Sequence, residues 1–174
     1  MIRTGIRDRA VMISATPPTT PRLRLESTGA RRSLLDGGWW PRSSDPVAEL
    51  PGLILAIDAR RGPVIRLLLA RGDWVSHPGR LGVAGRVVRL GYFVSQPAGL
   101  LTAVCGNRSR VDLLVVPPDT AGDTAGAAML VAATAGNLIH AQDILLSLKK
   151  PAAGATERAP EAVWDTEGGR LAAA

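Results

Sequence analysis

The sequence predicts an α+β fold: a single layer of mostly antiparallel sheet with five or six strands, and two helices on one face. Short apolar runs at 64–70, 81–90, 100–105 and 111–116 are separated by turn residues, and strands joined by tight turns pair antiparallel. Stretches with helical spacing flank these runs and do not alternate with them. This order is typical of a layered α+β domain and not of a doubly wound sheet.

The length of the chain favours one domain. It has 174 residues, of which 46% are hydrophobic, and this supplies enough apolar surface for a packed core. Prolines and glycines are frequent in the flanks. We therefore expect a disordered arm at 1–20, one folded domain at 21–148 and a disordered tail at 149–174. Met12 is an alternative start, in which case residues 1–11 are not translated.

The first half of the predicted domain contains one strand, one helix and a long connection. Residues 22–26 alternate polar and apolar side chains, as a half-buried strand does. Residues 27–45 are interpreted as the connection. Asp45-Pro46 begins a helix, with a side-chain acceptor before a proline, and Gly62-Pro63 ends it. Pro51 either kinks this helix or marks a second start.

The second half contains two hairpins and two helices. The first hairpin turns near Ala84-Gly85. The second turns at Gly106-Asn107, because both residues tolerate positive φ. Asp123 or Thr124 caps a helix that runs to about residue 135, and a shorter helix is expected at about 140–148.

The charge is basic and uneven. The formal net charge is +6, from 21 Lys and Arg against 15 Asp and Glu. Much of the excess lies in the N-terminal arginines, and such an arm can bind phosphates. A further basic patch forms if the hairpin arginines share a face, these being Arg80, Arg86, Arg89, Arg108 and Arg110. A solvated sheet face is the simpler interpretation, because aromatic residues are scarce there.

Several classes of protein are disfavoured. Cys105 is the single cysteine, so no intrachain disulfide or cysteine-rich zinc site can form. The start lacks the apolar stretch of a signal peptide, and no run has the length of a membrane span. We expect a cytoplasmic protein. His77 and His140 with scattered carboxylates make no metal signature, and no cofactor or catalytic residue is predicted.

One segment has the composition of a binding site, and its candidate residues are Asp36, Trp39, Trp40, Arg42 and Ser43. The indoles offer stacking faces, and the guanidinium suits a carboxylate or phosphate. The hydroxyl precedes a helix N-terminus, which favours anions. A small anionic or aromatic ligand, or a peptide of a protein partner, fits this chemistry. The alternative is structural: a tryptophan fills the core edge, and the arginine pairs with a carboxylate.

Several strings resemble a known family. They are Arg22-Leu-Arg-Leu25, Leu35-Asp-Gly-Gly-Trp-Trp-Pro-Arg-Ser43, Glu49-Leu-Pro51, Arg89-Leu-Gly-Tyr92 and Leu113-Leu-Val-Val-Pro-Pro-Asp-Thr120. Together they resemble the actinobacterial domain-of-unknown-function family 5994, over about residues 21–148. The resemblance implies an actinobacterial, intracellular single domain, and it carries no catalytic residue over to this chain.

The sequence therefore leaves three functions open. The first is a non-enzymatic binding or interaction module that uses the Trp39/Trp40/Arg42 surface. The second is a weak, phosphate-driven nucleic-acid binder that uses the N-terminal arginine arm. The third is an enzyme of unrecognised type.

Overall fold

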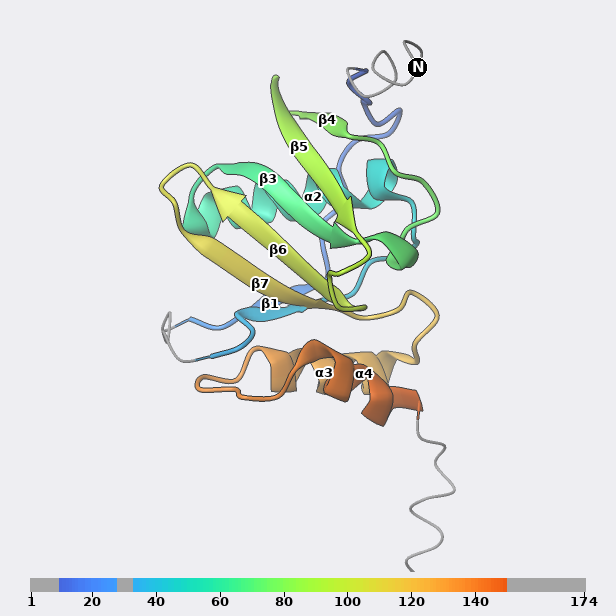
Figure 1. Ribbon diagram of the computed structural model, residues 1–174, viewed down its shortest axis with the longest axis vertical. Helices are drawn as coiled ribbons and strands as arrows, with labels where there is room; N and C mark the ends of the chain where they lie inside the picture. The colour runs from blue at the N-terminus through green and yellow to red at the C-terminus, as the bar shows by residue number, and fades with distance from the viewer. Residues whose placement is uncertain (1–9, 28–32, 150–174) are drawn as a thin grey trace, which may run out of the picture.

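The computed structural model describes residues 10–27 and 33–149 (Figure 1). Its centre is one seven-stranded mixed sheet in the order β1-β2-β7-β6-β3-β5-β4. The strands are β1 (Leu23–Leu25), β2 (Gly37–Trp39), β3 (Val64–Ala70), β4 (Arg80–Val83), β5 (Arg86–Phe93), β6 (Leu100–Cys105) and β7 (Arg110–Val115). The α+β class is confirmed, with seven strands where five or six were expected.

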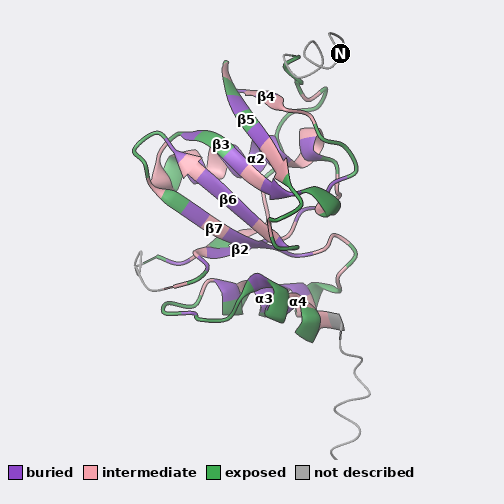
Figure 2. Cartoon of the chain, viewed as in Figure 1, coloured by how far each residue is buried: buried purple, intermediate pink, exposed green. Residues whose placement is uncertain are grey.

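Helices lie on both faces of this sheet. They are α2 (Pro46–Arg61), α3 (Gly122–Ala132) and α4 (Ala141–Lys149). Val111 and Leu113 share one buried cluster with the apolar face of α2, whereas Leu114 of the same strand packs with α3 and α4. Alternate residues of a strand point to opposite faces. The expected pair of helices on one face is therefore replaced by one helix on one face and two on the other (Figure 2).

Two of the strand pairs are parallel. β2 runs parallel to β7, and β3 runs parallel to β5, with Leu67 opposite Leu90. The other neighbouring strands pair antiparallel. Parallel pairing needs a crossover connection, so it does not follow from adjacent turns in the sequence.

Strand β2 was not predicted, because its residues lie in what the sequence suggested was a connection. Two of its three residues are glycines, and both lie where a side chain would clash. A Cβ on Gly37 would lie 2.1 Å from the carbonyl oxygen of Arg24, and one on Gly38 would lie 2.8 Å from the Cα of Met129. Close packing of β2 against β1 and α3 thus requires glycine at these positions. Glycine is disfavoured in strands, so the sequence pattern did not indicate a strand here.

The caps of α2 follow the sequence. Asp45 accepts a hydrogen bond from the backbone N–H of Val47 at 3.0 Å, and Gly62 ends the helix with φ of 100°. Pro51 lies inside one continuous helix, so it marks no second start. Pro51 lies near the N-terminal end of α2. Because it lacks an N–H, the helix loses one backbone hydrogen bond, the one that residue 51 would donate to the first turn.

The two hairpin turns differ from one another. Ala84 and Gly85 have φ of 49° and 77°, as the predicted turn requires. In the second hairpin, however, the left-handed residue is Arg108, with φ of 67°, and not Gly106 or Asn107. Asn107 contributes through its side chain instead, accepting from the backbone N–H of Ser109 at 3.0 Å.

Part of the predicted N-terminal arm is described. Met12 pairs with the edge strand β4, donating to the carbonyl of Arg80 at 3.0 Å and accepting from Gly82 at 2.8 Å. The domain boundaries stay predictions, since residues 1–9 and 150–174 lie outside the described part of the chain. Across residues 10–27 and 33–149, no helix has the length and apolarity that a membrane crossing needs.

The close approach of β2 to α3 leads to a test. Gly38→Ala places a methyl group against the backbone of Met129, and we expect a loss of about 1–3 kcal/mol in the free energy of unfolding. Gly126→Ala on α3 is the matched control, because its Cβ meets nothing within 4 Å and alanine favours the helix. Urea unfolding measures the free energy of unfolding of both variants. Equal stability of the two variants would contradict the packing described.

Candidate functional site

The five predicted site residues lie in different surroundings. Asp36 lies near β7 and the end of α2. Asp36 accepts from the backbone N–H of Asp112 at 2.8 Å and lies 4.0 Å from the guanidinium of Arg61. Burial raises the pKa of its carboxyl above the ordinary value, and the backbone bond and Arg61 oppose this. These contacts join β7 to the end of α2.

Trp39 belongs to the core. It is 1% exposed, and its ring stacks on that of Trp74 with centroids 5.9 Å apart. Stacked aromatic rings add about 0.5–1.5 kcal/mol beyond their burial. Trp39 therefore supports the loop that carries Trp74.

Trp40 faces the other side of the sheet, where it packs with α3 and α4. The guanidinium of Arg22 lies 3.6 Å from its ring centroid and donates to the carbonyl oxygen of Trp40 at 2.9 Å. The indole N–H of Trp40 is buried without a hydrogen-bond partner among the described residues. The two adjacent indoles thus serve different cores.

Glu49 holds Arg42 and Ser43 at the start of α2. Its carboxylate accepts from the backbone N–H of Arg42 at 3.2 Å and from the hydroxyl of Ser43 at 3.0 Å. The guanidinium of Arg42 donates to the carbonyl of Thr20 at 3.0 Å. The structure thus brings two of the five residues together. Their role in binding a ligand stays a prediction.

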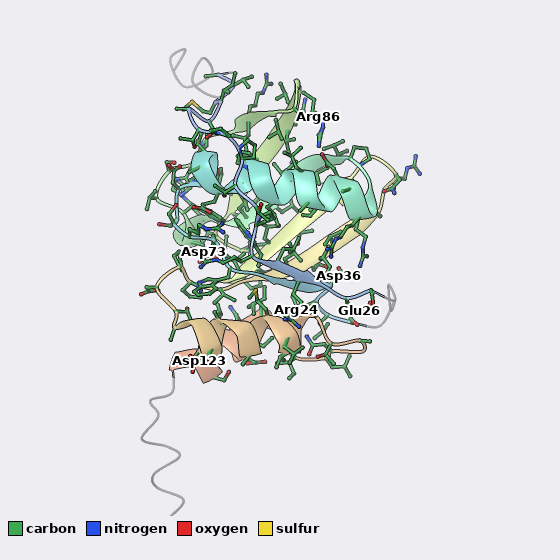
Figure 3. All side chains as sticks on the ribbon, turned by 180° about the vertical axis from the view of Figure 1, so that it is seen from behind. Arg24, Glu26, Asp36, Asp73, Arg86 and Asp123 are labelled. Atoms are coloured by element: carbon green, nitrogen blue, oxygen red, sulfur yellow. The ribbon has the colours of Figure 1, made fainter. Side chains whose placement is uncertain are left out.

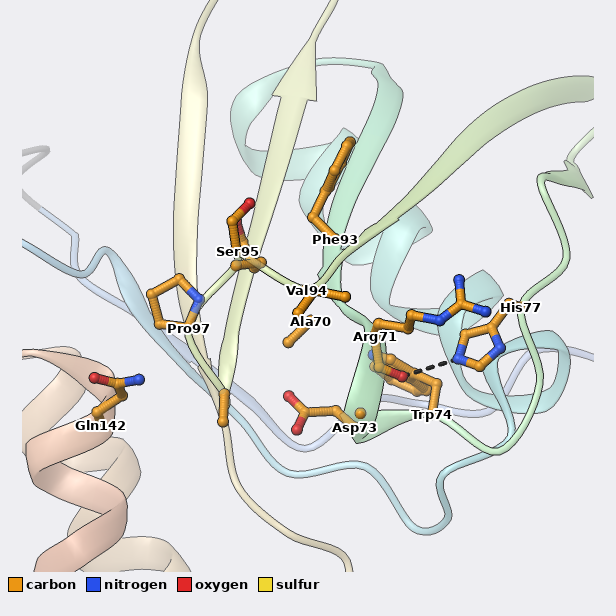
Figure 4. A pocket seen from close by; sticks show the side chains of 13 residues that line it. Ala70, Arg71, Asp73, Trp74, His77, Phe93, Val94, Ser95, Pro97 and Gln142 are labelled. Atoms are coloured by element: carbon orange, nitrogen blue, oxygen red, sulfur yellow. Dashed lines mark hydrogen bonds between the residues drawn. The ribbon is translucent and has the colours of Figure 1, made fainter.

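A pocket of about 670 Å³ lies elsewhere, at the carboxyl ends of the parallel strands β3 and β5 (Figure 4). We call it the Asp73 pocket. It is formed by the loops after these strands, 70–77 and 93–98, together with Gln142 of α4. Parallel strands end at the same edge of a sheet, and ligands commonly bind in the crevice that their loops form. The sides of Trp74 and Phe93 make its walls apolar.

Asp73 is the acidic residue of this pocket. It lies in a short 3₁₀ helix (Arg71–Asp73), and one of its oxygens accepts from the backbone N–H of Gly99 at 2.8 Å. No described residue donates to the other oxygen, Oδ1. Burial raises the pKa of the carboxyl above its ordinary value, while the bond from Gly99 lowers it. Figure 4 shows this carboxyl pointing into the space between Trp74 and Gln142.

The remaining polar groups lie around the rim. His77 contacts the carbonyl oxygen of Arg71 through Nε2 at 2.8 Å, and its ring meets the ring of Tyr92 edge-on with centroids 4.8 Å apart. The amide nitrogen of Gln96 donates to the carbonyl of Leu100 at 3.2 Å. The pocket therefore combines flat apolar walls with one carboxylate, the guanidinium of Arg71, and amide and imidazole groups.

A smaller cavity of about 110 Å³ adjoins this pocket. Asp73 and Trp74 line both spaces, and Ser43 and Ser44 line the smaller one. Of the five candidate residues, Ser43 thus lies beside the Asp73 pocket. Asp36 and Asp73 lie on opposite sides of the molecule (Figure 3).

The described residues give little support for a metal site or for a reactive cysteine. Across residues 10–27 and 33–149, no group of three or more His, Cys, Asp or Glu side chains could hold a metal ion. Cys105 is 1% exposed, and burial raises the pKa of its thiol. A raised thiol pKa disfavours the reactive thiolate.

Sequence reasoning missed the Asp73 pocket because its loops meet only through the parallel pairing of β3 and β5. Of the pocket residues, the sequence singled out only His77, as a residue assessed for metal binding, and Asp73, Gln96 and Gln142 carry no local signal. No local feature of the sequence distinguishes Asp36 from Asp73. The two residues differ in the end of the sheet at which each lies (Figure 3).

The buried carboxyl of Asp73 predicts a pH-dependent stability. Because its pKa is raised, the folded chain holds this proton more tightly than the unfolded chain, and stability falls as pH rises through the window above the ordinary value. We therefore expect the stability of the wild type, relative to Asp73→Asn, to fall as pH rises from about 3.9 and then to level off.

Urea unfolding between pH 3 and pH 7 measures this difference. Asp119→Asn, which removes an exposed carboxylate outside the pocket, controls for the loss of one charge. A difference that grows in favour of the wild type as pH rises would show that Asp73 stabilises the fold as an ion, and would contradict the burial argument.

Comparison with known protein families gives a match over much of the chain. Residues 22–132 match the family described as "Family of unknown function (DUF5994)". No curated protein and no solved structure shows significant similarity. Since the matched region is well over half of the chain and covers the sheet with α2 and α3, this protein belongs to the family of unknown function DUF5994.

Proposed function

We propose that this protein is a non-enzymatic binding module and that the Asp73 pocket holds its ligand. The surface first considered, Trp39/Trp40/Arg42, is less suited to this role, because Trp39 is 1% exposed and packs in the core. Its contribution is indirect. The stack of Trp39 on Trp74 supports one wall of the pocket.

The observation that carries the proposal is the half-buried carboxyl of Asp73 beside flat apolar walls. A volume of about 670 Å³ is within the range of small-molecule sites, which are commonly apolar with a few placed polar groups. Oδ1 of Asp73 accepts no hydrogen bond from the described residues. It is therefore available to a donor on a ligand.

These features define the class of ligand. A flat, apolar body suits the space beside Trp74 and Phe93, and a cationic or donating amino group suits Asp73. Binding is favoured over catalysis, because no serine hydroxyl lining the pocket is hydrogen-bonded to His77 or Asp73. Such a pairing is the usual way in which a serine nucleophile is activated.

Nucleic-acid binding through the N-terminal arginine arm stays a prediction, because residues 1–9 lie outside the described chain. A cytoplasmic location likewise stays a prediction.

Two isosteric probes test the proposal. Benzamidine is flat and cationic, whereas benzamide has the same shape and no charge. We expect calorimetry to show that benzamidine binds the wild type more tightly than benzamide does. Asp73→Asn should weaken benzamidine binding about tenfold or more, because a hydrogen bond to a charged group contributes about 1.5–3 kcal/mol.

Trp40→Phe is the control, since Trp40 packs with α3 and α4 and does not line the pocket. It should leave benzamidine binding unchanged. Equal binding of the two probes would overturn the role of Asp73. If Trp40→Phe loses benzamidine binding and Asp73→Asn keeps it, the binding site lies at the Trp40 segment and not in the Asp73 pocket.

A further inference from the structure

Among the described residues, no helix covers part of one sheet face. α2 covers one face, and α3 and α4 pack over β1, β2 and β7 on the other. Figure 1 looks onto the second face, where β3, β5 and β6 lie uncovered. Arg66, Val87, Arg89 and Phe93 are among its exposed residues.

The register of the strands aligns three arginines on this face. Arg66 of β3 lies directly opposite Arg89 of β5, and Arg89 lies directly opposite Arg80 of β4. Direct partners on neighbouring strands share a face and lie about 5 Å apart. We call Arg66, Arg80 and Arg89 the arginine row. It runs across the strands for about 10 Å between its outer residues.

No acidic side chain of the described residues pairs with the row. Within the described residues, Arg66, Arg80 and Arg89 form no ion pair or side-chain hydrogen bond. On the same face, Asp112 pairs with Arg110 at 3.1 Å. Of the arginines singled out in the sequence, Arg86 turns instead to the α2 side and pairs with Asp58. Like charges directly opposite one another destabilise a sheet, so the arginine row lowers the stability of the fold.

An aromatic ring lies on the same face, at the end of β5. Phe93 is 40% exposed, and a Cβ on Gly91 would lie 2.8 Å from its ring. The missing side chain of Gly91 therefore leaves the space in which this ring lies against the sheet. Its exposed part borders the Asp73 pocket and offers an aromatic surface for stacking.

We propose that the arginine row and Phe93 bind single-stranded nucleic acid without sequence preference. A line of unpaired cations fits a linear polyanion better than it fits one isolated phosphate, and the net charge of +6 favours the approach of such a partner. The guanidinium groups contact successive phosphates, and a base stacks on Phe93. The arginine row is separate from the Asp73 pocket, because neither Arg66, Arg80 nor Arg89 lines that pocket, whereas Phe93 borders both.

The experiment measures binding of a fluorescein-labelled 12-mer of deoxythymidine to the full chain by anisotropy. We expect log K to fall linearly with log salt, with a slope of about −2 for three phosphates on a single strand. The double variant Arg66→Gln/Arg89→Gln should lose about tenfold or more in affinity at 50 mM salt, and its slope should shrink by about 1.4.

A matched double variant controls for net charge. Arg60 and Arg108 are exposed, lie at the end of α2 and in the β6–β7 turn, and form no ion pair within the described chain. Arg60→Gln/Arg108→Gln removes the same charge and should change affinity less than threefold. An equal loss in both double variants would reduce the effect to overall charge and overturn the proposal.

Two further comparisons identify the partner. Phe93→Leu should lower affinity for the 12-mer about fivefold or more and leave affinity for an abasic strand of the same length unchanged. Polyglutamate of equal charge should bind at least tenfold more weakly than the 12-mer. Equal binding of polyglutamate would make the row a site for acidic proteins and overturn the proposal.

A deletion separates the row from the N-terminal arm. Met12 pairs with β4 beside Arg80, so the described N-terminal segment lies close to the row. Deletion of residues 1–9 should leave the effect of Arg66→Gln/Arg89→Gln in place. If the deletion abolishes binding and the double variant does not, the arm is the binding element and the proposal is wrong.

Discussion

The short strand β2 links the two sides of this fold, because two of its positions have no side chain. Gly37 approaches the backbone of Arg24, and Gly38 approaches the backbone of Met129. β2 can therefore lie against β1 and α3 while Trp39 reaches the opposite core and stacks on Trp74. The close packing at the glycines thus positions a wall of the Asp73 pocket.

The pocket itself depends on parallel pairing. β3 and β5 end at the same edge of the sheet, and the loops that follow them meet there. An antiparallel pair would place these two loops at opposite ends. The bond from Gly99 holds Asp73 in the pocket, while burial raises the pKa of its carboxyl. One carboxylate oxygen of Asp73 thus accepts a backbone hydrogen bond, and the described residues donate none to the other.

The arginines fall into two groups with different physical roles. Some stabilise the fold by joining elements that are distant in sequence: Arg22 lies over Trp40, and Arg86 pairs with Asp58. The arginine row joins nothing among the described residues and carries mutual repulsion. A row of this kind reduces stability unless a polyanion neutralises it, and this is the physical basis for assigning it a partner.

The sequence by itself determined the local features: the α+β class, the cap of α2 at Asp45, the turn at Ala84-Gly85 and the approximate extents of α3 and α4. These follow from periodicity and from side chains that act on their own neighbours. The tertiary structure decided β2, the parallel pairs, the opposite faces of Trp39 and Trp40, and the alignment of Arg66 with Arg89. Each of these depends on which distant segments become neighbours, and no local pattern records that choice.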